Sequence, residues 1–218
     1  MSWRLLKKPY EIVPDVYDVT VHREYGRRYR CYLVDGDVPT LVDTCHDETE
    51  PKETLFEGLD ELGVDPERLV LTHGDGDHAG GFDAVVDRYG VETWVPAETD
   101  LATAHDPNHR YGDGDRVCGF EAVHVPGHEP DSYALVNEAA DYAVLGDAVV
   151  GADVRGLPAG YFVVHGEGYT DDPRAAERNL TNLTDYDFDA GLVFHGSSVL
   201  EAASEKVEAY VDGPKRDR

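Results

Sequence analysis

The stretch Thr72-His73-Gly74-Asp75-Gly76-Asp77-His78-Ala79-Gly80-Gly81 places four side chains that can bind a metal within six positions. The run Arg68–Leu71 before it predicts a buried strand, and the apolar spacing over residues 81–89 predicts a helix. The turn is therefore expected where the carboxyl end of a strand passes into a helix, the usual place for a ligand site in an α/β protein.

The donor chemistry of this turn favours a transition metal. His73 and His78 offer neutral nitrogen, while Asp75 and Asp77 offer anionic oxygen, a set that suits zinc, iron or manganese better than magnesium or calcium. The competing interpretation is a solvated acidic turn, which is natural in a chain with 45 Asp and Glu residues. That interpretation accounts for the aspartates but gives no role to the two histidines.

Three further donors downstream have similar surroundings. His128 follows the turn Val125-Pro126-Gly127, and Asp147 and His195 each end an apolar run beside a glycine. With the 72–81 turn, this order resembles the metallo-β-lactamase superfamily, whose pattern is His-x-His-x-Asp-His followed by separate His, Asp and His ligands. The resemblance covers about residues 10–200 and implies a four-layer αβ/βα sandwich of two mixed β-sheets flanked by helices.

The resemblance also implies roles for individual residues. His73 and His128 would bind a first metal ion, a second ion would be bound by Asp77, His78 and His195, and Asp147 would bridge the two. Two divalent ions are implied, with zinc expected and iron or manganese as alternatives. Asp43 matches an early aspartate of the family that steadies the ligand loop, although an aspartate capping a turn after a strand would look the same.

Asp75 departs from the family pattern, which has a histidine there. Asp75 binds the first metal through oxygen in one interpretation, as a glutamate does in the flavodiiron relatives. In another it does not reach the metal, which leaves His73, His128 and Asp147 as an iron-type face of two histidines and one carboxylate. In a third the first site is weak or empty. Coordination by Asp75 is preferred, because glycines on both sides allow the backbone to adjust.

The resemblance implies a metal-dependent hydrolase that uses a metal-activated hydroxide on an ester, thioester or related small-molecule bond, with Asp77 orienting the nucleophile. Arg155, Tyr161 and His165 lie in a loop where the family lines its substrate pocket. The first alternative is a mononuclear iron persulfide dioxygenase that uses His73, His128 and Asp147. The second is a non-catalytic metal-binding relative.

Length and composition favour one domain over residues 1–212 with a frayed tail at 213–218. The first residues contain too short an apolar stretch for a signal peptide, and no run approaches the about 18 apolar residues of a membrane helix, so a cytoplasmic protein is expected. The three cysteines lack Cys-x-x-Cys spacing, which argues against a disulfide framework. Oligomeric state is not predicted.

The formal net charge is −26, with few lysines. Self-repulsion at this level is relieved by concentrated salt, so the composition predicts a halophilic, salt-adapted protein. The same charge argues against a nucleic-acid partner. The basic residues Arg23, Arg27, Arg28 and Arg30 are expected on the solvent face of a hairpin around Gly26.

Period and turn residues predict the order of elements. Strands are expected near residues 10–21, 29–34, 39–43, 68–72 and 91–95, then 116–125, 131–137, 141–146 and 191–194. Helices are expected near 49–62, 81–89, 171–184 and 198–211. The polar stretch 105–115 is expected to be a loop.

Overall fold

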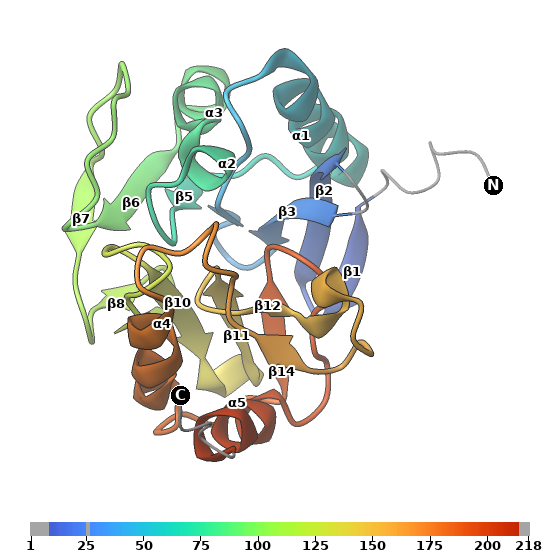
Figure 1. The fold of residues 1–218 in the computed structure, drawn as a ribbon. Coiled ribbons are helices and arrows are strands. Elements are labelled where there is room, and N and C mark those ends of the chain that lie inside the picture. Colours follow the sequence, from blue (N-terminus) through green and yellow to red (C-terminus); the bar gives the residue numbers. More distant parts are fainter. Residues whose placement is uncertain (1–8, 25–26, 214–218) are drawn as a thin grey trace. The chain divides into compact units, whose positions relative to one another are not determined.

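The structure is a computed structural model that describes residues 9–24 and 27–213. The chain falls into two compact units, Met1–Tyr111 and Gly112–Arg218. Each unit has its own sheet and helices (Figure 1). A single domain over residues 1–212 stays a prediction, and the tail expected to fray lies outside the described residues after Gly213.

The first unit contains a seven-stranded mixed sheet in sequential order. Neighbouring strands are antiparallel from β1 to β4 and parallel from β4 to β7. Its strands are β1 (Tyr10–Val13), β2 (Val16–Glu24), β3 (Arg27–Val34), β4 (Thr40–Val42), β5 (Arg68–Val70), β6 (Glu92–Pro96) and β7 (His109–Tyr111). Its helices are α1 (Thr49–Leu62), α2 (Gly76–Ala79) and α3 (Phe82–Tyr89).

One core joins α1 and α3 to this sheet. Leu55 and Leu59 of α1, together with Phe82 and Val85 of α3, pack against alternate residues of the strands such as Val19. Every second residue of a strand is buried when one face of the sheet packs on a helix, because successive side chains point to opposite faces. The core therefore fixes the register of β5, the strand that leads into the metal-capable turn.

The second unit contains a five-stranded mixed sheet, in which β11 and β14 are parallel and the other neighbours are antiparallel. Its strands, in spatial order, are β14 (Ala190–Val193), β11 (Tyr142–Gly146), β10 (Tyr133–Asn137), β9 (Phe120–His124) and β8 (Arg116–Val117). A separate pair is formed by β12 (Val150–Gly151) and β13 (Phe162–Val163). Short 3-10 helices are η2 (Glu138–Ala140), η3 (Ala152–Arg155) and η4 (Leu180–Leu183).

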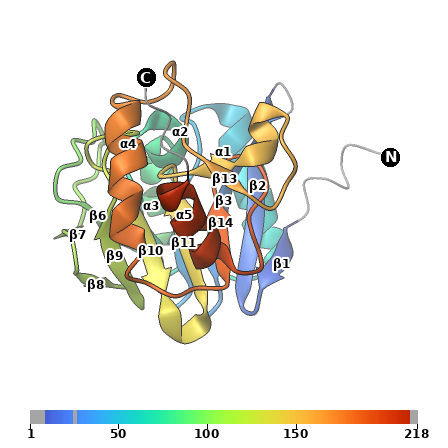
Figure 2. The ribbon, with the colours of Figure 1, turned by 60° about the horizontal axis from the view of Figure 1, so that its bottom comes forward.

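Helices α4 (Pro173–Asn179) and α5 (Ala203–Asp212) cover one face of this sheet (Figure 2). Ala176 of α4 and Val207 of α5 share a buried core with strand residues such as Val136 and Leu145. Asp172 begins α4, because its Oδ1 accepts a hydrogen bond from the Ala175 amide at 2.9 Å and proline occupies the first helical turn. The predicted α/β class, with two mixed sheets flanked by helices, is confirmed.

Several boundaries differ from those predicted, and β7 is the clearest case. Residues 105–115 were expected to form a loop, yet His109–Tyr111 pairs in parallel with β6. Asn108 Oδ1 accepts hydrogen bonds from the Thr93 amide and hydroxyl, and the Tyr111 hydroxyl donates to the Leu71 carbonyl at 2.6 Å. Tertiary contacts therefore recruit a polar segment whose local sequence gives no strand signal.

The expected solvent position of the arginine cluster is wrong for Arg30. Arg30 is 1% exposed, and its Nε lies 2.8 Å from Oδ2 of the buried Asp18. Arg28 Nη2 reaches the same oxygen at 3.0 Å. A buried guanidinium needs such a carboxylate on the neighbouring strand. Gly26 and the side chains of Arg23 and Arg27 lie outside the described residues.

None of the helices in the described part of the chain combines the length and the apolar character needed to cross a membrane.

Candidate metal centre

The metal-capable turn of the first unit lies between β5 and α3, as the sequence predicts. Its second half forms the short helix α2, which begins after Asp75. The Asp75 carbonyl accepts hydrogen bonds from the amides of His78 at 3.0 Å and Ala79 at 2.8 Å. The His73 and His78 rings are fully buried with centroids 4.1 Å apart, whereas Asp75 and Asp77 are half-buried.

Close packing requires the two glycines at the end of the turn. A Cβ on Gly80 would come within 2.4 Å of the Asp47 amide nitrogen, and one on Gly81 would lie 3.0 Å from Thr44 Cβ. Thr44 holds the same turn, because its amide and its hydroxyl both donate to the His78 carbonyl, at 2.7 and 2.6 Å. The His78 backbone is thus fixed by the segment after β4.

Asp43 holds the ligand turn through both carboxylate oxygens. Oδ1 accepts from the Thr72 amide at 2.7 Å, and Oδ2 accepts from the Thr72 hydroxyl at 2.8 Å. His78 Nδ1 lies 2.9 Å from the same Oδ2. These contacts support the predicted role of Asp43 in steadying the loop, which stays a prediction.

This network selects one tautomer for each histidine. The Thr72 hydroxyl gives its only hydrogen to Asp43, so His73 Nδ1, 3.0 Å from that hydroxyl oxygen, has to be the donor. His78 Nδ1 likewise donates to the Asp43 carboxylate. In a neutral imidazole the lone pair then lies on Nε2, which is how orienting partners prepare histidines for a metal. The role of Thr72 was not predicted, because nothing in its spacing distinguishes it from a strand residue.

We expect Asp43→Asn to lower metal affinity by about 10–100-fold, the usual cost of losing an orienting partner. An asparagine keeps only one acceptor oxygen for the three donors, so one donor would face the NH₂ group. Thr72→Val removes the hydroxyl that bonds to Asp43 and His73 but keeps the Thr72 amide and the contact between Asp43 and His78, so it should weaken the ion bound by His73 more than the other. Isothermal titration of metal-free protein with zinc would measure both effects.

The matched control is Asp47→Asn, which makes the same change at an exposed aspartate that contacts Lys52. Metal affinity in Asp47→Asn should equal that of the wild type. If Asp43→Asn also bound zinc as tightly as the wild type, Asp43 would only cap the turn.

In the second unit, strand ends bring three predicted ligands together. β11 and β14 are parallel neighbours, with Gly146 opposite Val193, so Asp147 and His195 follow the same edge of the sheet. His128 follows β9 after the turn at Gly127. The three side chains are buried, at 4% exposure for His128, 3% for Asp147 and 6% for His195.

Gly127 holds His128 against the start of α4. Its φ angle is +146°, and an added Cβ would lie 2.2 Å from the Ala176 amide nitrogen. The amides of Asp171 and Asp172 donate to the carbonyls of His128 and Gly127, at 3.0 and 2.9 Å. Glycine is required because backbone approaches backbone here.

Gly127→Ala should therefore destabilise the protein by about 3 kcal/mol or more, through steric overlap and backbone strain. Urea denaturation followed by circular dichroism would measure the loss. Gly156→Ala is a comparison with no atom within 4 Å of the new Cβ, though its φ of +72° keeps the backbone cost. Equal losses in the two variants would rule out the overlap with α4.

Three imidazole nitrogens surround one oxygen of Asp147. His195 Nε2 lies 3.4 Å and His128 Nε2 lies 3.6 Å from Asp147 Oδ2. The third is His165 Nε2, at 2.9 Å from the same oxygen. This set of neutral nitrogen and carboxylate oxygen donors, held largely away from solvent, fits a divalent transition metal.

The residues expected to contact substrate lie in different surroundings. Tyr161 is 60% exposed. Arg155 is exposed but points its Nη2 at the Val164 carbonyl, 3.0 Å away. His165 has a side chain only 11% exposed and belongs to the Asp147 cluster. Substrate contact by these residues stays a prediction.

Cys45, two residues after Asp43, is completely buried. Burial raises the pKa of its thiol to about 12, an effect that exceeds the opposing influence of Lys52. Cys45 packs in the hydrophobic core of the first unit.

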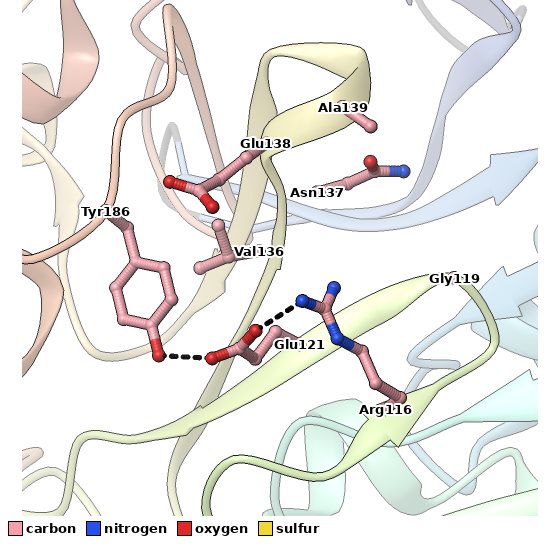
Figure 3. Close-up of a pocket in the computed structure, with 8 residues that line it drawn as sticks. All are labelled: Arg116, Gly119, Glu121, Val136, Asn137, Glu138, Ala139 and Tyr186. Atoms are coloured by element: carbon pink, nitrogen blue, oxygen red, sulfur yellow. Dashed lines mark hydrogen bonds and ion pairs between the residues drawn. The ribbon is translucent and has the colours of Figure 1, made fainter.

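A pocket of about 220 Å³ in the second unit lies between β8, β9 and η2 (Figure 3). Glu121 crosses it and is paired on both sides, with Arg116 Nη2 at 2.7 Å and the Tyr186 hydroxyl at 2.7 Å. Burial raises the pKa of Tyr186 to about 12, and the hydrogen bond to Glu121 and the negative charge of Glu121 add to this effect. None of the predicted metal ligands lines this pocket.

The chain is similar in sequence to proteins named as a hydrolase and as a thioesterase. It is 34% identical over 105 residues to a hydroxyacylglutathione hydrolase of Serratia proteamaculans, covering 46% of this chain and 40% of that protein. An atrochrysone carboxyl ACP thioesterase of Pseudocercospora fijiensis is 25% identical over 166 residues, covering 73% of this chain and 44% of that protein. The chain thus spans less than half the length of both relatives.

Structural comparison agrees on the fold. A metallo-beta-lactamase family protein of Thermus thermophilus matches with a TM-score of 0.70 and 19% identity, over 92% of this chain and 79% of that one. The family model of the metallo-beta-lactamase superfamily matches residues 26–207, which include all the predicted ligands. The chain therefore belongs to the metallo-beta-lactamase superfamily.

Proposed function

We propose that this chain is a metal-dependent hydrolase that cleaves an ester or thioester bond of a small molecule. The proposal is based on a network of hydrogen bonds around Asp43. Asp43 contacts His73 through the Thr72 hydroxyl, and it contacts His78 directly. The network orients two buried imidazoles through Nδ1, which supports Nε2 as the atom that would bind a metal. Buried imidazoles need hydrogen-bond partners in any fold, but here both rings are oriented through Nδ1, as metal-binding histidines commonly are. The thioester preference rests on the names of the two relatives.

The proposed metal ligands are those of the family pattern. They are His73, Asp75, Asp77, His78, His128, Asp147 and His195. When bound, two divalent metal ions would supply an activated water at neutral pH and polarise the scissile carbonyl. Zinc is the proposed metal, with iron or manganese as alternatives.

The chain's own residues would do the remaining work. Asp77 would accept a hydrogen bond from the attacking water and orient it toward the carbonyl carbon. Arg155 and Tyr161, both exposed, are the proposed substrate contacts, and His165, the third residue expected from the resemblance, is considered separately below. We further propose a cytoplasmic location at high salt, with no nucleic-acid partner, because of the −26 charge.

The proposal is tested with metal-free protein that is reloaded with zinc, iron or manganese and supplied with ester, thioester, phosphodiester and persulfide substrates. We expect hydrolysis of esters or thioesters that a chelator stops and added metal restores. Consumption of oxygen with persulfide, at one iron per chain, would indicate the dioxygenase instead. Bound metal without turnover of any substrate would indicate a binding protein.

The place of Asp75 in the ligand set gives a separate prediction. If its carboxylate binds the first ion, Asp75→Ala should lose much of that ion at limiting metal. Asp75→His should keep both ions and shift selectivity toward zinc, because imidazole is a softer donor. Metal content by elemental analysis measures both results, and Asp65→Ala, at an exposed aspartate of the same unit, is the control.

Neither glycine beside Asp75 has a positive φ angle. Asp75 itself has φ −60° and ψ 145°, a conformation that any residue adopts, so the Asp75 variants should fold. Unchanged metal content in Asp75→Ala would remove Asp75 from the ligand set.

A further inference from the structure

We propose that His165 is a metal ligand, bound to the same ion as His128 and Asp147. The inference rests on the proposed function and deepens it, because it adds an imidazole that the family pattern does not contain. It concerns only the second unit, where the four side chains come from four separate loops. His128 follows β9, Asp147 follows β11, His165 follows β13 and His195 follows β14.

The separations within this cluster are those of ligands on a shared ion. Two donors that each bind an ion at about 2.0–2.2 Å lie about 2.8–3.6 Å apart, for angles from octahedral to tetrahedral. The distances from Asp147 Oδ2 to Nε2 of His165, His195 and His128 are 2.9, 3.4 and 3.6 Å. All three distances fall within that range.

Hydrogen bonding accounts poorly for the position of His165. A charge-assisted bond from nitrogen to a carboxylate oxygen is about 2.7–2.9 Å long and well aligned. His165 Nε2 has the distance, but it forms no acceptable hydrogen bond with any described residue. A nitrogen 2.9 Å from a carboxylate oxygen to which it forms no hydrogen bond is placed as a second ligand would be.

The backbone holds His165 in this position. β13 pairs with β12, and Val164, the residue before His165, is buried in the core of the second unit. Arg155 Nη2 donates to the Val164 carbonyl at 3.0 Å. The His165 ring lies with its centroid 4.7 Å from that of His128 and 5.5 Å from that of His195. Such a fixed, largely buried ring differs from the adaptable side chain that a substrate contact in a loop would need.

The test is the proton NMR spectrum of the full chain loaded with cobalt(II). Each coordinated imidazole contributes one exchangeable ring N–H signal with a large paramagnetic shift, and an uncoordinated histidine contributes none. We expect one signal each from His73, His78, His128, His165 and His195. His165→Gln should lose one signal and bind one ion more than about 100-fold more weakly, beyond the about 10–100-fold cost of losing an orienting partner.

His124→Gln is the matched control, because His124 lies in the same unit and its ring contacts the Pro130 carbonyl rather than Asp147. It should keep all five signals. A wild-type spectrum with signals from only the four histidines of the family pattern would overturn the proposal, even if His165→Gln failed to fold.

The NMR result for His165 and the result of the hydrolysis assay can be told apart. Five signals in a protein that hydrolyses no substrate would keep the His165 assignment and reject the hydrolase. Four signals in an active hydrolase would reject the His165 assignment and keep the proposed hydrolase function.

Discussion

Replacing Asp147 with asparagine should remove most of the bound metal and abolish hydrolysis. Nε2 atoms of three histidines lie within 3.6 Å of its Oδ2, so this one atom is close to the predicted ligands His128 and His195 and to the proposed ligand His165. The carboxylate is 3% exposed, which leaves little water to replace it. Asparagine has nearly the same shape but no negative charge, and its NH₂ group cannot bind a metal.

We expect the metal content of Asp147→Asn to fall below one ion per chain and the catalytic rate to fall by at least about 10³-fold, as for the loss of a central catalytic group. Elemental analysis and kinetics on the proposed substrates would measure both. Removing a buried carboxylate that faces imidazoles should leave the fold intact or more stable without metal, because its desolvation cost also disappears.

Asp185→Asn is the control, since it removes the same charge from an exposed position of the same unit. It should bind metal and turn over substrate as the wild type does. Two ions retained in Asp147→Asn would contradict both the bridging role and the ligand cluster around Oδ2.

Dilution of salt should unfold the protein. With a net charge of −26 on 218 residues, repulsion between carboxylates extends over about 30 Å at 0.01 M salt and over only about 3 Å at 1 M. We expect the fold and activity to be lost below about 0.3 M salt and regained near 1 M, as screening removes the self-repulsion of the compact state.

Thermal melts by circular dichroism across a sodium chloride series would measure this effect. Sucrose at equal osmolality is the control, because it favours burial by exclusion from the surface without screening charge. Stability that is equal in dilute buffer and at 1 M salt would contradict the prediction. Full rescue by sucrose would show that exclusion, rather than screening, is the cause.

The sequence alone predicted what depends on local patterns. The turn between β5 and α3 was predicted because an apolar strand, a glycine-rich turn and a helical period follow one another within a short stretch. His128, Asp147 and His195 were singled out because each follows an apolar run, and parallel neighbours β11 and β14 carry two of them to one sheet edge. The spacing of apolar residues and the choice of turn residues depend on positions close together in the chain, so both can be recognised from the sequence without a structure.

Only the tertiary structure decided which distant residues meet. β7 forms because Asn108 and Tyr111 bond to residues of other segments, and Arg30 is buried because Asp18 lies on the neighbouring strand. The bond from Thr72 to His73 and the position of His165 beside Asp147 likewise depend on how separate segments pack. Such contacts follow from the packing of the whole core, which no local pattern in this sequence encodes.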